Sequence, residues 1–158
     1  MNARDSGLTT ARRWGPWLVL LQFGLLGLLA WRAASNLGPA FWRAAVLLPL
    51  AAGCALVLWA LWANRPGNFH VRPLPKDGAE LVLHGPYRWI RHPMYGALLL
   101  AAAAVVVAKP DAVTVAAALA LWAVLWLKSG VEEHAMRERH PAYADYCQGK
   151  GRFLPRPF

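Results

Sequence analysis

The chain has 158 residues, a length typical of one domain. Hydrophobic residues make up 58% of it and charged residues 16%, whereas soluble domains have roughly 45–50% and about 25%. The net charge of +9 would favour nucleic-acid binding in a soluble protein, but here the charges lie outside long apolar stretches. This distribution excludes an ordinary soluble domain. It predicts a protein of the lipid bilayer and no nucleic-acid partner.

Four stretches contain no charged residue: Trp14–Trp31 (18 residues), Ala44–Ala63 (20), Met94–Ala108 (15) and Ala112–Leu127 (16). The first two approach the roughly 20 residues that cross a hydrocarbon core of about 30 Å. The last two would reach only about 22–24 Å as helices. We expect them to form a short helical hairpin that turns at Lys109-Pro110-Asp111. The alternative, a pair of core helices in a soluble protein, leaves too little chain to cover them.

The first stretch also has features of a signal peptide, because Arg12 and Arg13 precede it and Ala33-Ala34-Ser35 follow it. However, its apolar run exceeds the roughly 7–15 residues usual for such a peptide, and Arg32 lies beside the possible cleavage site. We therefore expect an uncleaved first span.

The basic residues predict how the chain is oriented. If the N-terminus is cytoplasmic and the chain crosses four times, every Lys and Arg except Arg32, Arg43 and Lys109 lies on the cytoplasmic side. The positive-inside rule therefore favours cytoplasmic N- and C-termini. The same orientation brings Gly85–Tyr95 and the C-terminal residues to one side of the membrane.

We predict an all-α integral membrane protein with about four transmembrane helices, in one domain over residues 1–158. Residues 1–64 would hold two spans, and residues 65–158 a core with the polar motif, the hairpin and the tail. A cytoplasmic C-terminal helix is expected over Lys128–Tyr146, broken at Pro141. The Ala-, Arg- and Trp-rich composition favours a GC-rich bacterial genome, and the membrane is then expected to be a bacterial inner membrane. Two cysteines without suitable geometry predict no disulfide, and no metal-spaced Cys/His set or signal for oligomerisation is present.

The densest polar segment, Gly85-Pro-Tyr-Arg-Trp-Ile-Arg-His-Pro-Met-Tyr95, leads directly into the third apolar stretch. A helix that begins near Pro93 would turn its free N–H groups toward the cytoplasm, which favours a carboxylate or phosphate. Arg91 and His92 would reinforce that anion site. On the same side, Glu132 and Glu133 supply negative charge for an ammonium, a ribose hydroxyl or a developing cation. A zwitterionic ligand with carboxylate, amine and sulfonium groups fits these charges.

The simpler alternative is that Arg88, Trp89 and Arg91 are membrane-border anchors and part of an aromatic belt. That alternative leaves Tyr87 and Tyr95 unexplained, as well as the acidic pair that follows later on the same side.

Four motifs follow one another along the chain: Gly85-Pro-Tyr-Arg-x-x-Arg-His-Pro-Met-Tyr95, Lys128-x-x-x-Glu-Glu133, Tyr143-x-x-Tyr146 and Arg152-x-x-Pro155. With this ordered set the chain resembles the isoprenylcysteine carboxyl methyltransferase and phospholipid methyltransferase superfamily. Asn68-Phe69, Arg72-Pro73 and Leu81-Val82 resemble the lead-in of its bacterial members. The resemblance covers Asn68–Pro155, whereas the first two spans match only in kind.

The resemblance implies that S-adenosyl-L-methionine is bound without a Rossmann fold. It also implies a lipophilic, membrane-dissolved methyl acceptor, either an isoprenylcysteine carboxylate or a phospholipid. By the family pattern the cofactor pocket is lined by Leu81, Val82, Tyr87, His92, Pro93, Met94, Tyr95 and Glu132. The charge argument adds Arg91 and Glu133.

Lys128 and Glu132 are expected to orient the acceptor. The family usually has an arginine at the position of Lys128, and lysine keeps the charge without the bidentate fork. Two other functions stay open. Sterol and steroid reductases have a similar Arg-His-Pro-x-Tyr segment and use NADPH, although their intramembrane polar residues outnumber the Gln22 and Cys54 of this chain. A non-catalytic lipid-binding protein on the same scaffold is the third possibility, because of Lys128.

Overall fold

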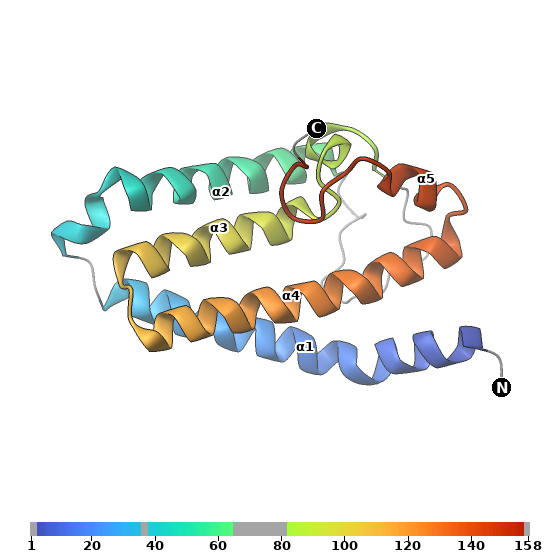
Figure 1. Cartoon of the computed structure of the whole chain (residues 1–158), viewed down its shortest axis with the longest axis horizontal. Coiled ribbons are helices and arrows are strands. Elements are labelled where there is room, and N and C mark those ends of the chain that lie inside the picture. Colours follow the sequence, from blue (N-terminus) through green and yellow to red (C-terminus); the bar gives the residue numbers. More distant parts are fainter. Residues whose placement is uncertain (1–2, 36–37, 65–81, 157–158) are drawn as a thin grey trace.

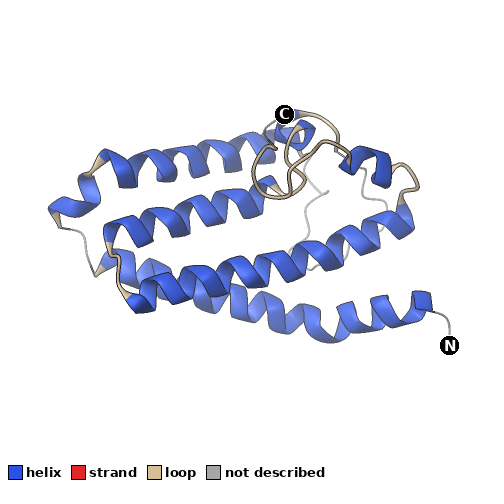
Figure 2. Cartoon of the chain, in the orientation of Figure 1, coloured by secondary structure: helices blue, strands red, loops and turns tan. Residues whose placement is uncertain are grey.

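The computed structural model describes residues 3–35, 38–64 and 82–156. Its regular elements there are helices, apart from one isolated bridge between Ile90 and Gly151 (Figure 2). They are α1 (Ala3–Ala34), the 3₁₀ helix η1 (Pro39–Trp42), α2 (Ala44–Ala63), the 3₁₀ helix η2 (Gly85–Arg88), α3 (Pro93–Ala108), α4 (Ala112–Arg139) and α5 (Tyr143–Cys147). Leu81, Asn68-Phe69 and Arg72-Pro73 lie outside the described residues.

The four long helices lie side by side, with α2 packed on α3 and α1 packed on α4 (Figure 1). The start of α3, the end of α4, α5 and the C-terminal tail meet at one end of this bundle, which we call the tail end. The opposite end, called the turn end, holds η1 and the connection between α3 and α4. The predicted turn at Lys109-Pro110-Asp111 is confirmed.

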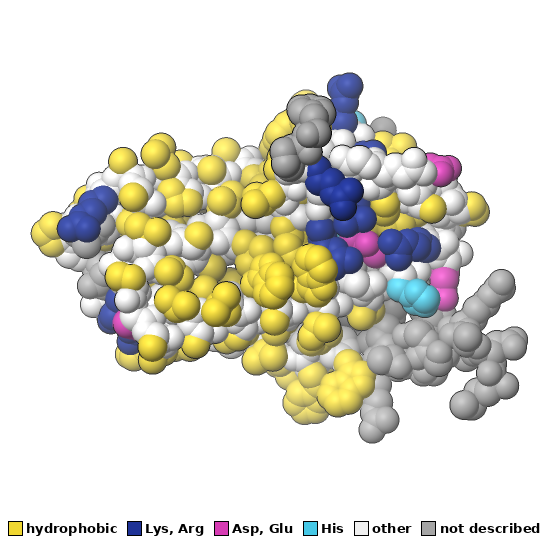
Figure 3. All heavy atoms as spheres, viewed as in Figure 1, with side chains coloured by type: hydrophobic (Ala, Val, Ile, Leu, Met, Phe, Trp, Pro, Cys, Tyr) yellow, Lys and Arg dark blue, Asp and Glu magenta, His cyan; other side chains and the backbone are white. Residues whose placement is uncertain are grey.

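Three described helical segments are long and apolar enough to cross a membrane: Trp14–Ala34, Ala44–Ala63 and Ala112–Glu138. The helix α3 is apolar but shorter, with 16 residues. Large hydrophobic side chains cover the outside of the bundle, among them Trp17 at 65% and Trp62 at 83% exposure. In Figure 3 these side chains form a broad apolar surface between two charged ends. Such a surface needs lipid around it.

Small residues bring α2 and α3 close together. A Cβ atom added to Gly53 would lie only 3.1 Å from the carbonyl oxygen of Ala97. The buried residues of the two helices also include five more alanines: Ala60, Ala63, Ala102, Ala104 and Ala108. Because apolar burial drives helix association weakly inside a bilayer, close backbone packing of this kind is a main source of stability there.

At the turn end, Asp111 starts α4 by accepting a hydrogen bond from the Thr114 N–H at 3.0 Å. Arg32 of α1 forms an ion pair with Asp111 and donates from Nε to Thr114 Oγ1 at 3.2 Å. These bonds connect the end of α1 to the hairpin turn.

The helix α4 is longer than the sequence predicted. The charge-free stretch ends at Leu127, and the sequence predicts a separate helix from Lys128. Instead, a single helix of 28 residues runs from Ala112 to Arg139. The prediction was wrong because Lys128 is buried among the helices and therefore does not mark the border of the bundle. The predicted break at Pro141 is confirmed, since α4 ends before it and α5 begins after it.

The close packing of α2 on α3 gives a first prediction. Gly53→Ile should force the two helices apart and lower the free energy of unfolding by about 1–3 kcal/mol, a typical cost of overpacking. Thermal unfolding in detergent, followed by circular dichroism, measures the effect. Gly24→Ile is the matched control, because a Cβ atom at Gly24 meets nothing within 4 Å. Equal melting temperatures for the two variants would contradict this account of the packing.

Candidate active site

The C-terminal tail is bound to the segment that precedes α3 through backbone hydrogen bonds. The Arg91 N–H donates to the Gly151 carbonyl at 2.9 Å, and the His92 N–H donates to the Arg152 carbonyl at 2.9 Å. In return, the Gly151 N–H donates to the Trp89 carbonyl at 3.0 Å. This parallel bridge fixes the tail beside the start of α3.

Two glycines make this approach possible. A Cβ atom on Gly96 would collide with the carbonyl oxygen of Phe153, so only glycine lets the tail pass over the first turn of α3. Gly85 has a φ of +62°, and its Cβ atom would lie 2.5 Å from that of Ala63. The motif therefore needs glycine at both positions for the shape of the backbone.

His92 joins the start of α3 to the acidic pair on α4. Its Nε2 atom lies 3.1 Å from Glu133 Oε1, and its Nδ1 atom lies 3.4 Å from Glu132 Oε2. The Tyr95 hydroxyl donates to Glu132 Oε1 at 2.5 Å. The rings of His92 and Tyr95 are stacked, with centroids 5.5 Å apart and planes 6° from parallel. Both carboxylates are thus held against the segment that the sequence singled out.

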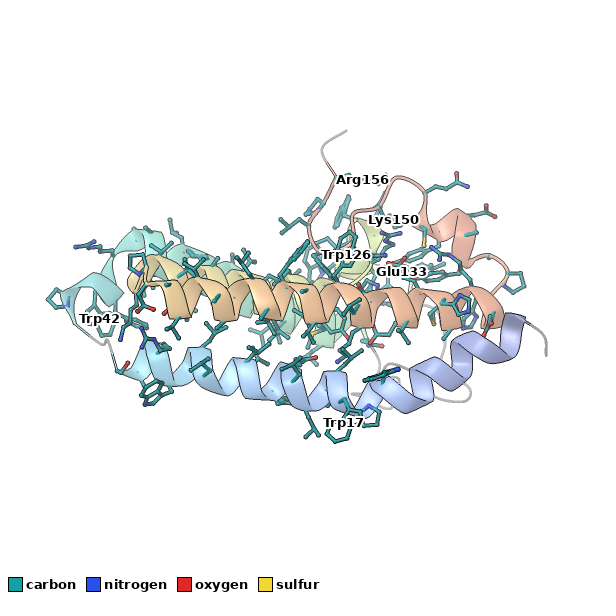
Figure 4. The ribbon with its side chains drawn as sticks, turned by 60° about the horizontal axis from the view of Figure 1, so that its bottom comes forward. Trp17, Trp42, Trp126, Glu133, Lys150 and Arg156 are labelled. Carbon is teal, nitrogen blue, oxygen red and sulfur yellow. The ribbon has the colours of Figure 1, made fainter. Side chains whose placement is uncertain are left out.

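Glu133 is the most enclosed charge of this group, with 2% of its side chain exposed. Arg91 Nε lies 3.4 Å and Arg152 Nε 3.3 Å from its Oε1 atom, while Arg137 Nη2 lies 3.4 Å from its Oε2 atom. Figure 4 places Glu133 near Lys150, at the opposite end of the bundle from Trp42. Because basic groups surround this carboxylate on several sides, it has little charge left for a ligand.

The arginines, in contrast, keep donors unused. The Nε atoms of Arg91 and Arg152 are buried and have no hydrogen-bond partner among the described residues. Each lies near Glu133 without hydrogen-bond geometry. Buried donors are normally satisfied, so each of these two N–H groups lacks an acceptor within the described part of the chain, which a bound anion could supply.

Lys128 is buried one helical turn before Glu132, with 2% exposure. Its Nζ atom donates to Gln22 Oε1 of α1 at 2.6 Å and lies 5.3 Å from the centroid of the Tyr95 ring. Lys128 therefore contacts α1 and α3 from α4.

Aromatic side chains cover the cluster. Phe153 of the tail lies edge-on to His92 and Tyr95, with ring centroids 6.3 Å away in both cases, and 6.1 Å from Trp126. The guanidinium of Arg152 lies 4.0 Å from the centroid of the Trp126 ring. These contacts separate the charged groups from the apolar surface of the bundle.

The structure brings six of the predicted site residues into one cluster: Arg91, His92, Tyr95, Lys128, Glu132 and Glu133. Tyr87 makes different contacts, because its carbonyl oxygen accepts from the Tyr146 hydroxyl at 2.8 Å. Burial raises the pKa of Tyr87, and a hydrogen bond with Asn64 partly offsets that rise.

The remaining predicted residues contribute backbone or packing. Val82 and Met94 are half-buried, and Pro93 is the buried first residue of α3. The N–H groups of Tyr95 and Gly96 both donate to the His92 carbonyl, at 3.1 Å each. The sequence predicted that N–H groups at the start of this helix are free for an anion, and these two are not.

Sequence reasoning missed the contributions of Gln22, Trp126, Arg152 and Phe153. Gln22 left a signal, as a lone amide in an 18-residue apolar stretch. Arg152 belongs to the motif Arg152-x-x-Pro155, but its residue type does not indicate its partner. Trp126 and Phe153 resemble ordinary membrane-border aromatics, so their type alone does not indicate a site.

The titration of His92 gives a second prediction. Burial lowers the pKa of His92, but the hydrogen bonds and negative charges of Glu132 and Glu133 raise it by more, so it lies above the ordinary 6.5. The protonated ring therefore contributes stability that is complete below pH 6.5 and is lost as the pH rises through the folded-state pKa. The melting temperature should fall over that range in the native protein and in His134→Gln, an exposed position. In His92→Gln this component should disappear, and an unchanged pH profile would contradict the assignment.

A third prediction concerns the enclosed carboxylate. Glu133→Gln keeps the shape but leaves Arg91, Arg152 and His92 without their counter-charge, which should cost about 3–5 kcal/mol of stability. Glu138→Gln on the same helix is the matched control. Its partner His134 is 54% exposed, so its loss should cost under about 1 kcal/mol. Thermal unfolding in detergent compares the two, and similar losses would show that the cluster does not depend on Glu133.

Comparison with known families identifies the bundle. The family model of the phospholipid methyltransferases (PEMT) matches residues 40–142, from η1 to the start of the tail region. Comparisons with curated proteins and with solved structures found no match. The matched residues include the His92–Glu133 cluster, while α1 and the tail bridge lie outside them. Since the match covers more than half of this integral membrane protein, and agrees with the resemblance seen in its motifs, the chain belongs to the phospholipid methyltransferase family.

Proposed function

We propose that this protein transfers a methyl group from S-adenosyl-L-methionine to a lipid acceptor at the membrane surface. The observation that carries the proposal is the cluster formed by His92, Tyr95, Glu132 and Glu133 in a member of this family. It lies at one end of an apolar bundle. A soluble, charged donor and a lipid-dissolved acceptor can both reach such a border.

The residues of the cluster fit this cofactor. The unused Nε donors of Arg91 and Arg152 suit a carboxylate. Glu132, with 21% of its side chain exposed, is the less enclosed of the two carboxylates and suits a sulfonium or ammonium group. Glu133, already surrounded by basic groups, holds the arginines and His92 in position.

When bound, the cofactor supplies an electrophilic methyl group, and the transfer is an in-line displacement at that carbon. The residues of the chain then have to align the acceptor and keep water away. Tyr95 and His92 hold Glu132 in a fixed orientation, and Lys128 lies one turn deeper, where it can orient the acceptor. Phe153 and Trp126 exclude water from the apolar side.

We also propose that the tail end faces the cytoplasm of a bacterial cell and that α3 crosses the inner membrane as a fourth span. The distribution of basic residues supports this orientation, since among the described residues only Arg32, Arg43 and Lys109 belong to the turn end. As a helix of 16 residues, α3 is about 24 Å long, so the bilayer must thin locally around it. The whole chain would act as one domain.

A transfer assay with a labelled methyl donor tests the function. The purified protein is incubated with vesicles that contain phosphatidylethanolamine and, separately, with a short prenylcysteine in detergent. Label in either acceptor supports the proposal and identifies the acceptor. Titrations with S-adenosylhomocysteine and with NADPH accompany the assay. Binding of NADPH alone would indicate a reductase, and binding of neither a lipid-binding protein without catalysis.

A fourth prediction concerns Glu132. Glu132→Gln should reduce the preference for S-adenosylmethionine over S-adenosylhomocysteine on the order of tenfold, because only the former carries the sulfonium charge. Calorimetric titration of both ligands measures this ratio, with Glu138→Gln as the control. A ratio that does not change would contradict the contact between this carboxylate and the sulfonium.

A further inference from the structure

The helix α1 contributes a residue to the cluster although it lies outside the part of the chain that the family model matches. Its Gln22 is 6% exposed and accepts the hydrogen bond from Lys128. Both residues lie in segments that are long and apolar enough to cross a membrane. A buried amide and a buried lysine in such segments are costly and point to a function.

The hydrogen-bond partner of Lys128 is neutral, and the Glu132 carboxylate acts on the lysine charge from one helical turn away without an ion pair. An ammonium group has three N–H donors, and the described residues account for one of them, the bond to Gln22. Lys128 forms no ion pair with any described carboxylate. The nearest candidate on its own helix, Glu132, is bonded to Tyr95 and His92 instead. A buried cation in this state suits an anionic ligand.

We propose that Gln22 is a positioning residue that holds Lys128 so that its two remaining N–H donors bind an anionic oxygen of the acceptor lipid. This inference rests on the proposed function. The oxygen belongs either to the phosphodiester of a phospholipid or to the carboxylate of a prenylated cysteine. Lys128 precedes Glu132 by one turn, about 6 Å along the helix, so this oxygen lies deeper in the membrane than the charged cluster.

Position 22 has an amide and not a carboxylate, and this difference separates a structural role of the residue from a role in lipid binding. A glutamate there would satisfy the Lys128 N–H equally well, but it would also cancel the charge that attracts the lipid. A residue that served only to support the fold would tolerate that change. A residue that keeps Lys128 charged and available for a ligand would not.

The test compares Gln22→Glu and Gln22→Leu with the control Phe23→Leu, an adjacent exposed position on α1. Lipid bound to the detergent-purified protein is measured by native mass spectrometry for phosphatidylethanolamine, a prenylcysteine and neutral diacylglycerol. Melting temperature and affinity for S-adenosylhomocysteine are measured in parallel.

We expect Gln22→Leu to weaken binding of the lipid that supplies the anionic oxygen by about tenfold. Gln22→Glu should weaken it at least as much while melting no lower than the native protein. Cofactor affinity should stay within about twofold in both variants, because Gln22 does not contact His92 or Glu133. The tenfold loss of lipid binding corresponds to the loss of one hydrogen bond to a charged group. The preferred lipid of the native protein identifies which source supplies the oxygen.

Unimpaired lipid binding by Gln22→Glu would overturn the inference and leave the proposed function intact. A preference of the native protein for diacylglycerol would overturn it as well. Conversely, lipid binding that depends on Gln22 in a protein that transfers no methyl group would support the inference and refute the proposed function. If Gln22→Leu fails to fold, the glutamate variant still decides the question.

Discussion

The tail end of this bundle depends on a single enclosed carboxylate, that of Glu133. Arg91, Arg152 and His92 come from two segments far apart in the sequence, and all three approach this one side chain. Without the carboxylate, like charges would face one another at the border of an apolar bundle. The ion pairs therefore join the start of α3, the end of α4 and the tail, together with the backbone bridge between the tail and the segment before α3.

A continuous chain of polar contacts runs from the apolar interior to this carboxylate. Gln22 binds Lys128, Lys128 lies beside the ring of Tyr95, and Tyr95 binds Glu132. His92 then connects Glu132 to Glu133. These contacts link the buried interior of the bundle to its charged end. In a medium of low polarity such a network specifies one arrangement, since each unpaired member would be costly.

The sequence was sufficient to predict much of this fold, because apolar stretches, prolines and charges have local consequences. The limits of α2, the turn at Lys109-Pro110-Asp111 and the start of α3 at Pro93 are examples. The meeting of the Gly85–Tyr95 segment with the acidic pair followed from counting crossings.

The parts that sequence could not predict depend on how helices are rotated against one another. The continuation of α4 past Lys128 depends on burial of that lysine against α1, which its residue type argues against. The pairing of Gln22 with Lys128 requires one particular face of α1, and a stretch that is apolar all round has no periodicity to reveal it. The bridge of the tail to Trp89–His92 uses backbone atoms, so the glycine at position 96, which leaves space for the tail, is the main residue type that it requires.

That bridge has a consequence for biosynthesis. Residues 151–153 leave the ribosome after all four long helices, yet they complete the cluster by supplying Arg152 and Phe153. The cluster therefore cannot be complete until residues 151–153 have been synthesised. Before that point the start of α3 and the end of α4 lack Arg152 and Phe153 as neighbours.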